Sequence, residues 1–121
     1  MLLAGSEEKI FWTSHSRAKM RQYGFSEKRV LNIYRKPERK ESGIAPKTIA
    51  SMQVTGTSKN PREVWVMYAV SKGSSRGKKL KVIRIISAWK YPGRTPLGQR
   101  PMIPDDVLEE LKSFKKHEYF S

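Results

Sequence analysis

The sequence contains no cysteine, which excludes a disulfide framework, a thiolate nucleophile and any zinc site of the cysteine type. Its two histidines, His15 and His117, have no recognisable metal-ligand spacing, so we expect no metal and no cofactor. The opening MLLAG is too short for a signal-peptide core, and no apolar run is long enough to span a bilayer. These absences predict a soluble, cytoplasmic protein with no membrane partner.

Acidic residues are scarce: 11 Asp and Glu oppose 25 Lys and Arg, which gives a net charge of +14. The excess lies in two blocks, residues 15–40 with nine basic and two acidic residues, and residues 63–100 with nine basic and one acidic residue. A solvated surface needs far less charge than this. We therefore expect a polyanionic partner, although simple solubility is the alternative explanation.

The 121 residues predict one domain, 1–121, with a core over about 9–91, a proline-rich loop over 92–103 and a C-terminal helix over 104–117. Residues 9–13 read as a strand, and two short helices follow, separated by Gly24 and stopped by Pro37. Three further strands are expected over 47–56, 63–73 and 79–90. This order predicts an α+β fold in which the helices pack on a small, curved, antiparallel sheet of three to four strands.

Two stretches of the chain resemble a known group of proteins. RIISAWK, from Arg84 to Lys90, is similar to the last strand of BrnT-type toxins, and FWTSHSRAKMRQYGFSEKRVLNIYRKPE, from Phe11 to Glu38, resembles a related uncharacterised domain family. Both families belong to the RelE/ParE-like superfamily of small basic proteins. The resemblance covers roughly residues 9–91 and implies that fold.

Many RelE-like proteins are toxin endoribonucleases that cut messenger RNA, some of them on the ribosome, and each is paired with an antitoxin protein. The ParE branch acts on gyrase instead. The resemblance thus implies an RNA partner and an antitoxin. One position departs from it, because Trp89 stands where the BrnT-like pattern has a second arginine.

RNA cleavage without a metal needs a base for the 2′-hydroxyl, a cation for the phosphorane and an acid for the leaving oxygen. The candidate catalytic residues are His15, Lys19, Arg84 and Lys90. His15 and Lys19 are spaced i, i+4 and would share one helix face. The structural alternative for His15 is a hydrogen bond that fixes the strand-to-helix junction.

Arg84 interrupts an apolar strand, where a cation needs an anion, a carbonyl group or solvent. By alternation it would share a face with Val82, Ile86 and Ala88, opposite Ile83, Ile85, Ser87 and Trp89. It would meet a phosphate, pair with Glu63 of the neighbouring strand or lie at a free face of the sheet.

Further cationic and aromatic residues are candidates for nucleic-acid binding: Arg17, Arg21, Tyr23, Arg35, Lys36, Arg76, Lys78, Lys79, Trp89 and Tyr91. The aromatic residues would stack on unpaired bases or, alternatively, lie in the core. The runs RKPERK and RGKKLK are expected to form the rims of one basic groove, unless each is only a solvated face.

Two hypotheses follow. The first is a RelE/BrnT-like toxin endoribonuclease (mRNA interferase), and the second is a nucleic-acid-binding module that keeps the fold but does not cleave. Trp89 favours the second, whereas His15 and Tyr91 support the first.

Overall fold

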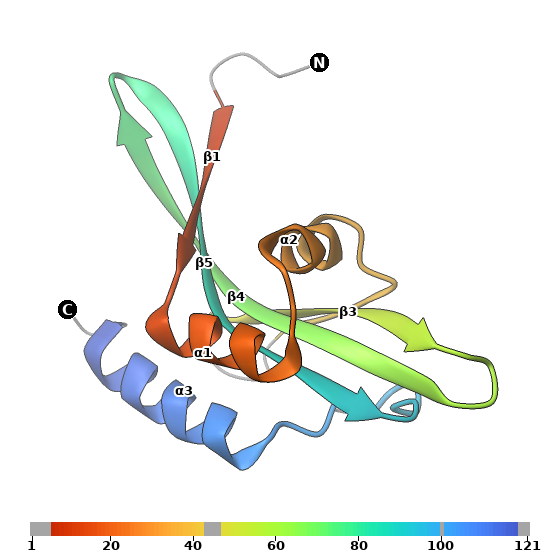
Figure 1. Cartoon of the computed structure of the whole chain (residues 1–121). Coiled ribbons are helices and arrows are strands. Elements are labelled where there is room, and N and C mark those ends of the chain that lie inside the picture. The colour runs from red at the N-terminus through yellow and green to blue at the C-terminus, as the bar shows by residue number, and fades with distance from the viewer. Residues whose placement is uncertain (1–5, 43–46, 100, 119–121) are drawn as a thin grey trace.

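A computed structural model describes residues 6–42, 47–99 and 101–118, with side chains of the last helix described as far as Lys112. The opening MLLAG and the side chain of His117, both used above, lie outside this part. The elements in chain order are β1 (Ser6–Trp12), α1 (Ser14–Tyr23), α2 (Glu27–Arg35), β2 (Arg39–Ser42), β3 (Ile49–Gly56), β4 (Pro61–Ser75), β5 (Lys78–Pro92) and α3 (Asp105–Glu118) (Figure 1).

The fold is α+β, with three helices and one five-stranded mixed sheet in the order β1-β5-β4-β3-β2. The predicted antiparallel sheet of three to four strands was therefore wrong in two respects. The first strand, β1, runs parallel to β5, and β2 is an additional edge strand paired with β3. The sequence of β2, RKES, is entirely polar and carries no hydrophobic alternation that would mark it as a strand.

The strands β4 and β5 form a long hairpin, which the Gly-, Ser- and Lys-rich segment 71–78 between them predicts. Its turn is Arg76-Gly77, and both residues have positive φ, 54° and 78°. This left-handed pair matches the right-handed twist of the strands that it joins. The outer half of the hairpin extends with β1 as an arm (Figure 1).

The ends of the first two helices are set by local hydrogen bonds. Thr13 caps α1 by accepting from the amide of Ser16, and Ser26 caps α2 by accepting from the amide of Arg29. Gly24 ends α1 in the left-handed conformation, with φ 73°. From sequence alone, Gly24 is expected to end α1, Ser26 to cap the start of α2, and Ser14 or Ser16 to cap the start of α1. The first two predictions are confirmed, whereas the third is wrong, because Thr13 is the cap.

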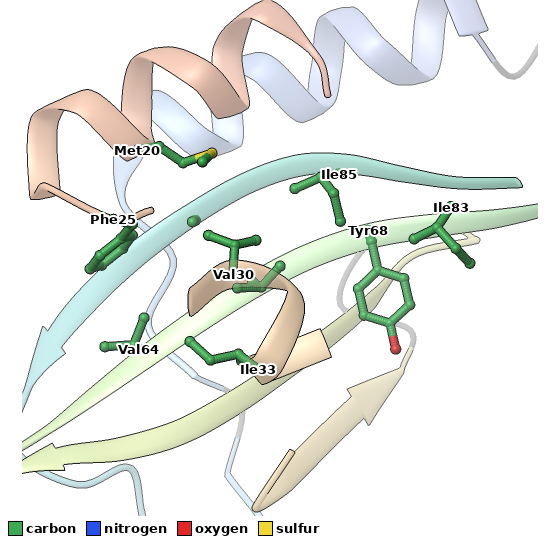
Figure 2. Close-up of a cluster of buried hydrophobic side chains, with 10 residues drawn as sticks. Met20, Phe25, Val30, Ile33, Val64, Tyr68, Ile83 and Ile85 are labelled. Carbon is green, nitrogen blue, oxygen red and sulfur yellow. The ribbon is translucent and has the colours of Figure 1, made fainter. Parts of the chain in front are cut away.

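The helices cover both faces of the sheet. Val30 and Ile33 of α2 are buried against alternate residues of β4 and β5, among them Tyr68 and Ile83 (Figure 2). On the opposite face, Val107 and Leu111 of α3 pack against a second cluster: Ala50, Met52, Trp65, Met67, Ile86 and Trp89. The helix α1 lies beside β5, just beyond the end of β1, where Thr13 donates to the carbonyls of Ile85 and Ile86.

A β-bulge at Ile86 changes which residues of β5 face which helix. Met67 is opposite Ser87 and the next residue, Tyr68, is opposite Ile85, so Ile86 has no partner in register. Before the bulge Ile83 and Ile85 face α2, whereas after it Ala88 does. Predicted alternation therefore failed for Ala88, Ser87 and Trp89, because one extra residue reverses the faces.

Within the described part of the chain, no helix combines the length and the apolar character needed to cross a lipid bilayer.

Candidate functional site

The two basic runs meet at a groove beside the end of α2. Arg35 and Lys40 come from RKPERK, and Lys81 comes from RGKKLK. The groove has a volume of about 510 Å³, within the range of roughly 300 to 1,000 Å³ usual for small-molecule sites. The prediction of one basic groove is confirmed for the ends of these two runs.

The groove has an aromatic wall and a partly apolar floor. Tyr34 packs edge-on against Tyr68, with ring centroids 4.8 Å apart and an interplanar angle of 86°. Ile49 and Val70 complete the apolar lining, and 40% of Val70 is exposed. Glu8 accepts a hydrogen bond of 2.7 Å from the Tyr34 hydroxyl and lies 3.6 Å from the Arg35 guanidinium. The groove therefore combines cations, flat apolar surface and one fixed carboxylate.

A second depression, of about 850 Å³, runs along the outer side of α2. Its lining residues include Lys28, Arg29 and Lys36, and Arg35 lines both depressions. The two depressions therefore share the Arg35 cation, and each also has one acidic residue in its lining, Glu27 in the second depression and Glu8 in the groove.

Two of the candidate catalytic residues, His15 and Lys19, lie instead in a polar seam between α1 and α3. The Nε2 of His15 is 3.0 Å from the Ser87 hydroxyl, and its Nδ1 is 3.7 Å from a carboxylate oxygen of Glu110. A neutral imidazole with its proton on Nδ1 satisfies both contacts, since the serine then donates to Nε2. His15 thus links α1, β5 and α3.

Lys19 occupies the other end of the seam. Its ammonium donates to Asp106 at 2.6 Å and lies 5.1 Å from the centre of the Tyr23 ring, and only 3% of the residue is exposed. Since the charge is already paired and the side chain is covered, Lys19 does not present a cation to a phosphate. The structure gives it the role of an anchor for α3.

Hydroxyl, imidazole and carboxylate lie here in the order of a serine-hydrolase triad. Ser87, however, has no exposed surface, and it lies on the sheet face that α3 covers. A nucleophile must reach its substrate, so this arrangement is not an active site in the structure. It is a buried hydrogen-bonded link between three elements.

The seam predicts a pH-dependent contribution to stability. Burial lowers the pKa of the His15 imidazole below 6.5, Glu110 and Asp106 act in the opposite direction, and Lys19 acts with burial. As the pH falls, His15 of the unfolded chain binds a proton at a higher pH than His15 of the folded protein does. The contribution of neutral His15 to the free energy of unfolding is therefore complete above pH 6.5 and is lost as the pH falls toward the lowered pKa of the folded protein. Urea unfolding at pH 8 and pH 5 should show a smaller loss of stability for His15→Asn than for the wild type.

The exposed Gln22→Ala on the same helix provides a control that should lose as much stability as the wild type. An equal loss in His15→Asn and the wild type would contradict the assignment.

Arg84 lies on β5, three residues before Ser87 of the seam. It is opposite Phe11 of β1 and Ala69 of β4, and it is half-buried on the sheet face opposite α2. The predicted partner Glu63 is six residues away from Ala69 along β4, about 20 Å at the usual rise per residue. The prediction of an Arg84–Glu63 pair is therefore wrong.

The remaining candidates at the end of β5 lie in different surroundings. Trp89 is 1% exposed and stacks on Trp65, with centroids 6.3 Å apart and an interplanar angle of 12°. Its predicted role as a platform for bases is wrong, because no base can reach the ring. Tyr91 packs against the same core cluster, and Lys90 lies 5.8 Å from the centre of the Phe25 ring. The four candidate catalytic residues therefore do not converge on one site.

Three of the proposed nucleic-acid contacts belong to α1 or its C-terminal end. Arg17 pairs with Glu27 and lies over Trp12, Tyr23 stacks on Phe25, and Arg21 is exposed in the last turn. Arg76, Lys78 and Lys79 are exposed at the tip of the β4–β5 hairpin. Of the ten predicted contacts, Arg35 and Lys36 lie in the depressions beside α2.

Of the residues that line the groove, only Arg35 was among the predicted site residues; the charged residues Glu8, Lys40 and Lys81 and the aromatic residue Tyr34 were missed, as was the remaining lining. Lys40 lies in RKPERK and Lys81 in RGKKLK, so the sequence identified the two basic runs but not which of their residues line the groove. The helical periodicity of residues 30–34 places Tyr34 on the apolar face of α2, and nothing in the sequence around Glu8 connects that residue with residues 34 and 81. Only the parallel pairing of β1 with β5 does so, since it sets Glu8 opposite Lys81.

Among the described residues, no three His, Asp or Glu side chains gather closely enough to hold a metal ion. Comparison of the chain with models of known protein families, with curated proteins and with solved structures gives no match.

Proposed function

We propose that this protein is an RNA-binding domain of RelE/BrnT-like type, which holds an RNA strand along the basic groove without cleaving it. The observation that carries the proposal is the convergence of Arg35, Lys40 and Lys81 around one groove. Lys81 is far from Arg35 and Lys40 in sequence, and each of the three side chains is exposed to solvent. Phosphate contacts by exposed Lys and Arg supply most of the affinity of such surfaces.

The net charge of +14 adds a long-range attraction for a polyanion. The depression along α2 and the cationic hairpin tip extend the basic surface beyond the groove. A cytoplasmic location and an encounter with ribosomal or messenger RNA are part of the proposal, as is the antitoxin partner that the RelE-like resemblance implies.

Endoribonuclease activity is the weaker candidate. Of its candidate catalytic residues, His15 is hydrogen-bonded to Ser87 beneath α3, and Lys19 is paired with Asp106. Neither lines the groove where the cations gather. A nuclease would need a different set of groups, and no histidine is among the described residues that line the groove.

Removing two groove cations should weaken RNA binding. We expect Lys40→Ala/Lys81→Ala to lower the affinity for a 20-nucleotide single-stranded RNA by about tenfold at 50 mM salt, and to reduce the slope of log K against log salt by about 1.4. Fluorescence anisotropy over a salt series measures both quantities. The reduced slope follows because two fewer counterions are released.

The matched control is Lys59→Ala/Lys112→Ala, which removes the same charge from the β3–β4 turn and from α3. Equal losses in the two double variants would mean that net charge, and not the groove, determines binding. Electrophoresis of the RNA after incubation, with and without ribosomes, should show an intact strand. Cleavage by the wild type that is absent in His15→Ala would contradict the non-cleaving binding module and support the endoribonuclease.

A further inference from the structure

The groove holds a feature that phosphate binding alone does not use, a carboxylate among the cations. Among the described residues that line the groove, Glu8 is the single acid. A carboxylate at this position opposes a phosphate, so a purely electrostatic groove would be better without it. Its presence points to a ligand with a hydrogen-bond donor as well as a negative charge.

Glu8 is held in place from two sides. The Tyr34 hydroxyl donates to Oε2 at 2.7 Å, and the Arg35 guanidinium lies 3.6 Å from Oε1. Burial, together with the bond to Glu8, raises the pKa of Tyr34 above 10, so the hydroxyl remains a donor at neutral pH. The Glu8 side chain is 32% exposed. Each carboxylate oxygen has two lone pairs and can accept a further hydrogen bond from a ligand.

The surfaces around Glu8 suit a flat ring. Tyr34 is partly exposed, Val70 is 40% exposed, and Ile49 adds apolar surface nearby. The cations Lys40 and Lys81 lie on the sheet side of the same groove. Base stacking against such side chains contributes about 1 to 3 kcal/mol per base in proteins that bind single strands.

We propose that the groove is a subsite for one unpaired nucleotide, in which Glu8 accepts a hydrogen bond from an amino group of the base and the cations bind its phosphate. The proposal rests on the proposed function and adds base selection to it. In a duplex the amino group is engaged in pairing and the base is stacked, so the subsite requires a single strand.

Glu8 should select cytosine over uracil. These bases have the same size, but cytosine carries an amino donor at N4 where uracil carries the acceptor O4. An ionised carboxylate only accepts hydrogen bonds, so it attracts the amino group and repels the carbonyl oxygen. A hydrogen bond to a charged group is commonly worth enough to give at least a tenfold difference in affinity.

The test is the binding of fluorescein-labelled C10 and U10 RNA by fluorescence anisotropy at fixed salt. We expect the wild type to bind C10 about ten times more tightly than U10. In Glu8→Gln the preference should fall to about twofold or less, because the amide can donate to O4 as well as accept from N4. A hairpin RNA of matched length and charge should bind more weakly than C10.

Glu7→Gln is the matched control, since it removes the same charge from the adjacent position of β1, whose side chain points to the other sheet face. It should keep the tenfold preference, which separates base selection from the change in net charge.

Equal binding of C10 and U10 by the wild type, or a preference that survives in Glu8→Gln, would overturn the subsite, while salt-dependent binding of both would leave the proposed function standing. Binding of the hairpin as tightly as C10 would overturn the requirement for an unpaired base. Failure of every RNA to bind would overturn the proposed function itself and the subsite with it.

Discussion

Replacement of Glu63 by alanine is expected to lower the free energy of unfolding by about 3 to 5 kcal/mol, the largest effect that we predict for a single polar side chain. Glu63 is completely buried in β4. Its carboxylate accepts hydrogen bonds from the indole of Trp65 at 3.0 Å, the amide of Thr95 at 2.9 Å and the hydroxyl of Thr95 at 2.7 Å. Alanine would leave all three donors without an acceptor.

The effect is large because this network ties the loop after β5 to the sheet. Arg94 lies 3.6 Å from the Glu63 carboxylate, and Arg39 of β2 donates to the carbonyls of Thr95 and Gln99 at 3.0 and 2.6 Å. Arg39 also lies over the Trp65 ring, 5.6 Å from its centre. Loss of the central acceptor therefore loosens contacts on several elements at once. A domain is commonly stable by only about 5 to 15 kcal/mol.

Urea denaturation monitored by circular dichroism measures the change. Glu63→Gln should lose less than alanine, since one oxygen remains to accept while the amide group faces another donor. Glu109→Ala is the control, because Glu109 is 74% exposed and its loss should change stability by no more than about 0.5 kcal/mol. A loss below about 1 kcal/mol for Glu63→Ala would show that the network is not a principal support of the fold.

The second large effect is expected at the link between α1 and α3. Asp106→Ala should cost about 1.5 to 3 kcal/mol, because it removes the hydrogen-bonded carboxylate from the covered ammonium of Lys19. The cost is smaller than for a fully buried pair, since 54% of the Asp106 side chain is exposed to solvent. Asp106 also lies in the first turn of α3, where a negative charge is favourable. The ammonium lowers the pKa of the Asp106 carboxyl, chiefly through its hydrogen bond, so this contribution is present above pH 3.8 and is lost as the pH falls below it.

A second substitution separates the ion pair from the helix end. Lys19→Met keeps the apolar stem and removes the charge, so Lys19→Met/Asp106→Ala should recover most of the stability lost in Asp106→Ala. Urea denaturation of the two single variants and the double variant gives the coupling energy. A double variant that is no more stable than Asp106→Ala would show that the loss comes from α3 itself and not from an unpaired lysine.

The helices and the long hairpin were predictable because their signals are local. Ser26 and Gly24 mark helix ends by bonds within a few residues, and Arg76-Gly77 supplies the turn between β4 and β5. The polar edge strand β2 was not predictable, because its pairing with β3 requires no hydrophobic pattern. The bulge at Ile86 was not predictable either. In a continuous apolar run, the sequence does not show which residue lacks a partner on the neighbouring strand.

The candidate site divides in the same way. The two cationic runs were identified from composition, but assignment of Trp89, Lys19 and His15 to an RNA surface required knowledge of what covers them. The helix α3 packs on that sheet face, far along the chain from residues 15 and 19. Because α3 contacts or covers Trp89, Lys19 and His15, these side chains have structural roles.

By itself, the sequence determined the α+β class, the positions of the helices and the two blocks of positive charge, because each depends on residues close together in the chain. Tertiary structure alone decided that Arg35, Lys40, Lys81 and Glu8 share a groove. Those residues lie on one helix and three strands, and their proximity follows from strand order and register. Register is fixed by the packing of whole faces, which no short stretch of sequence specifies.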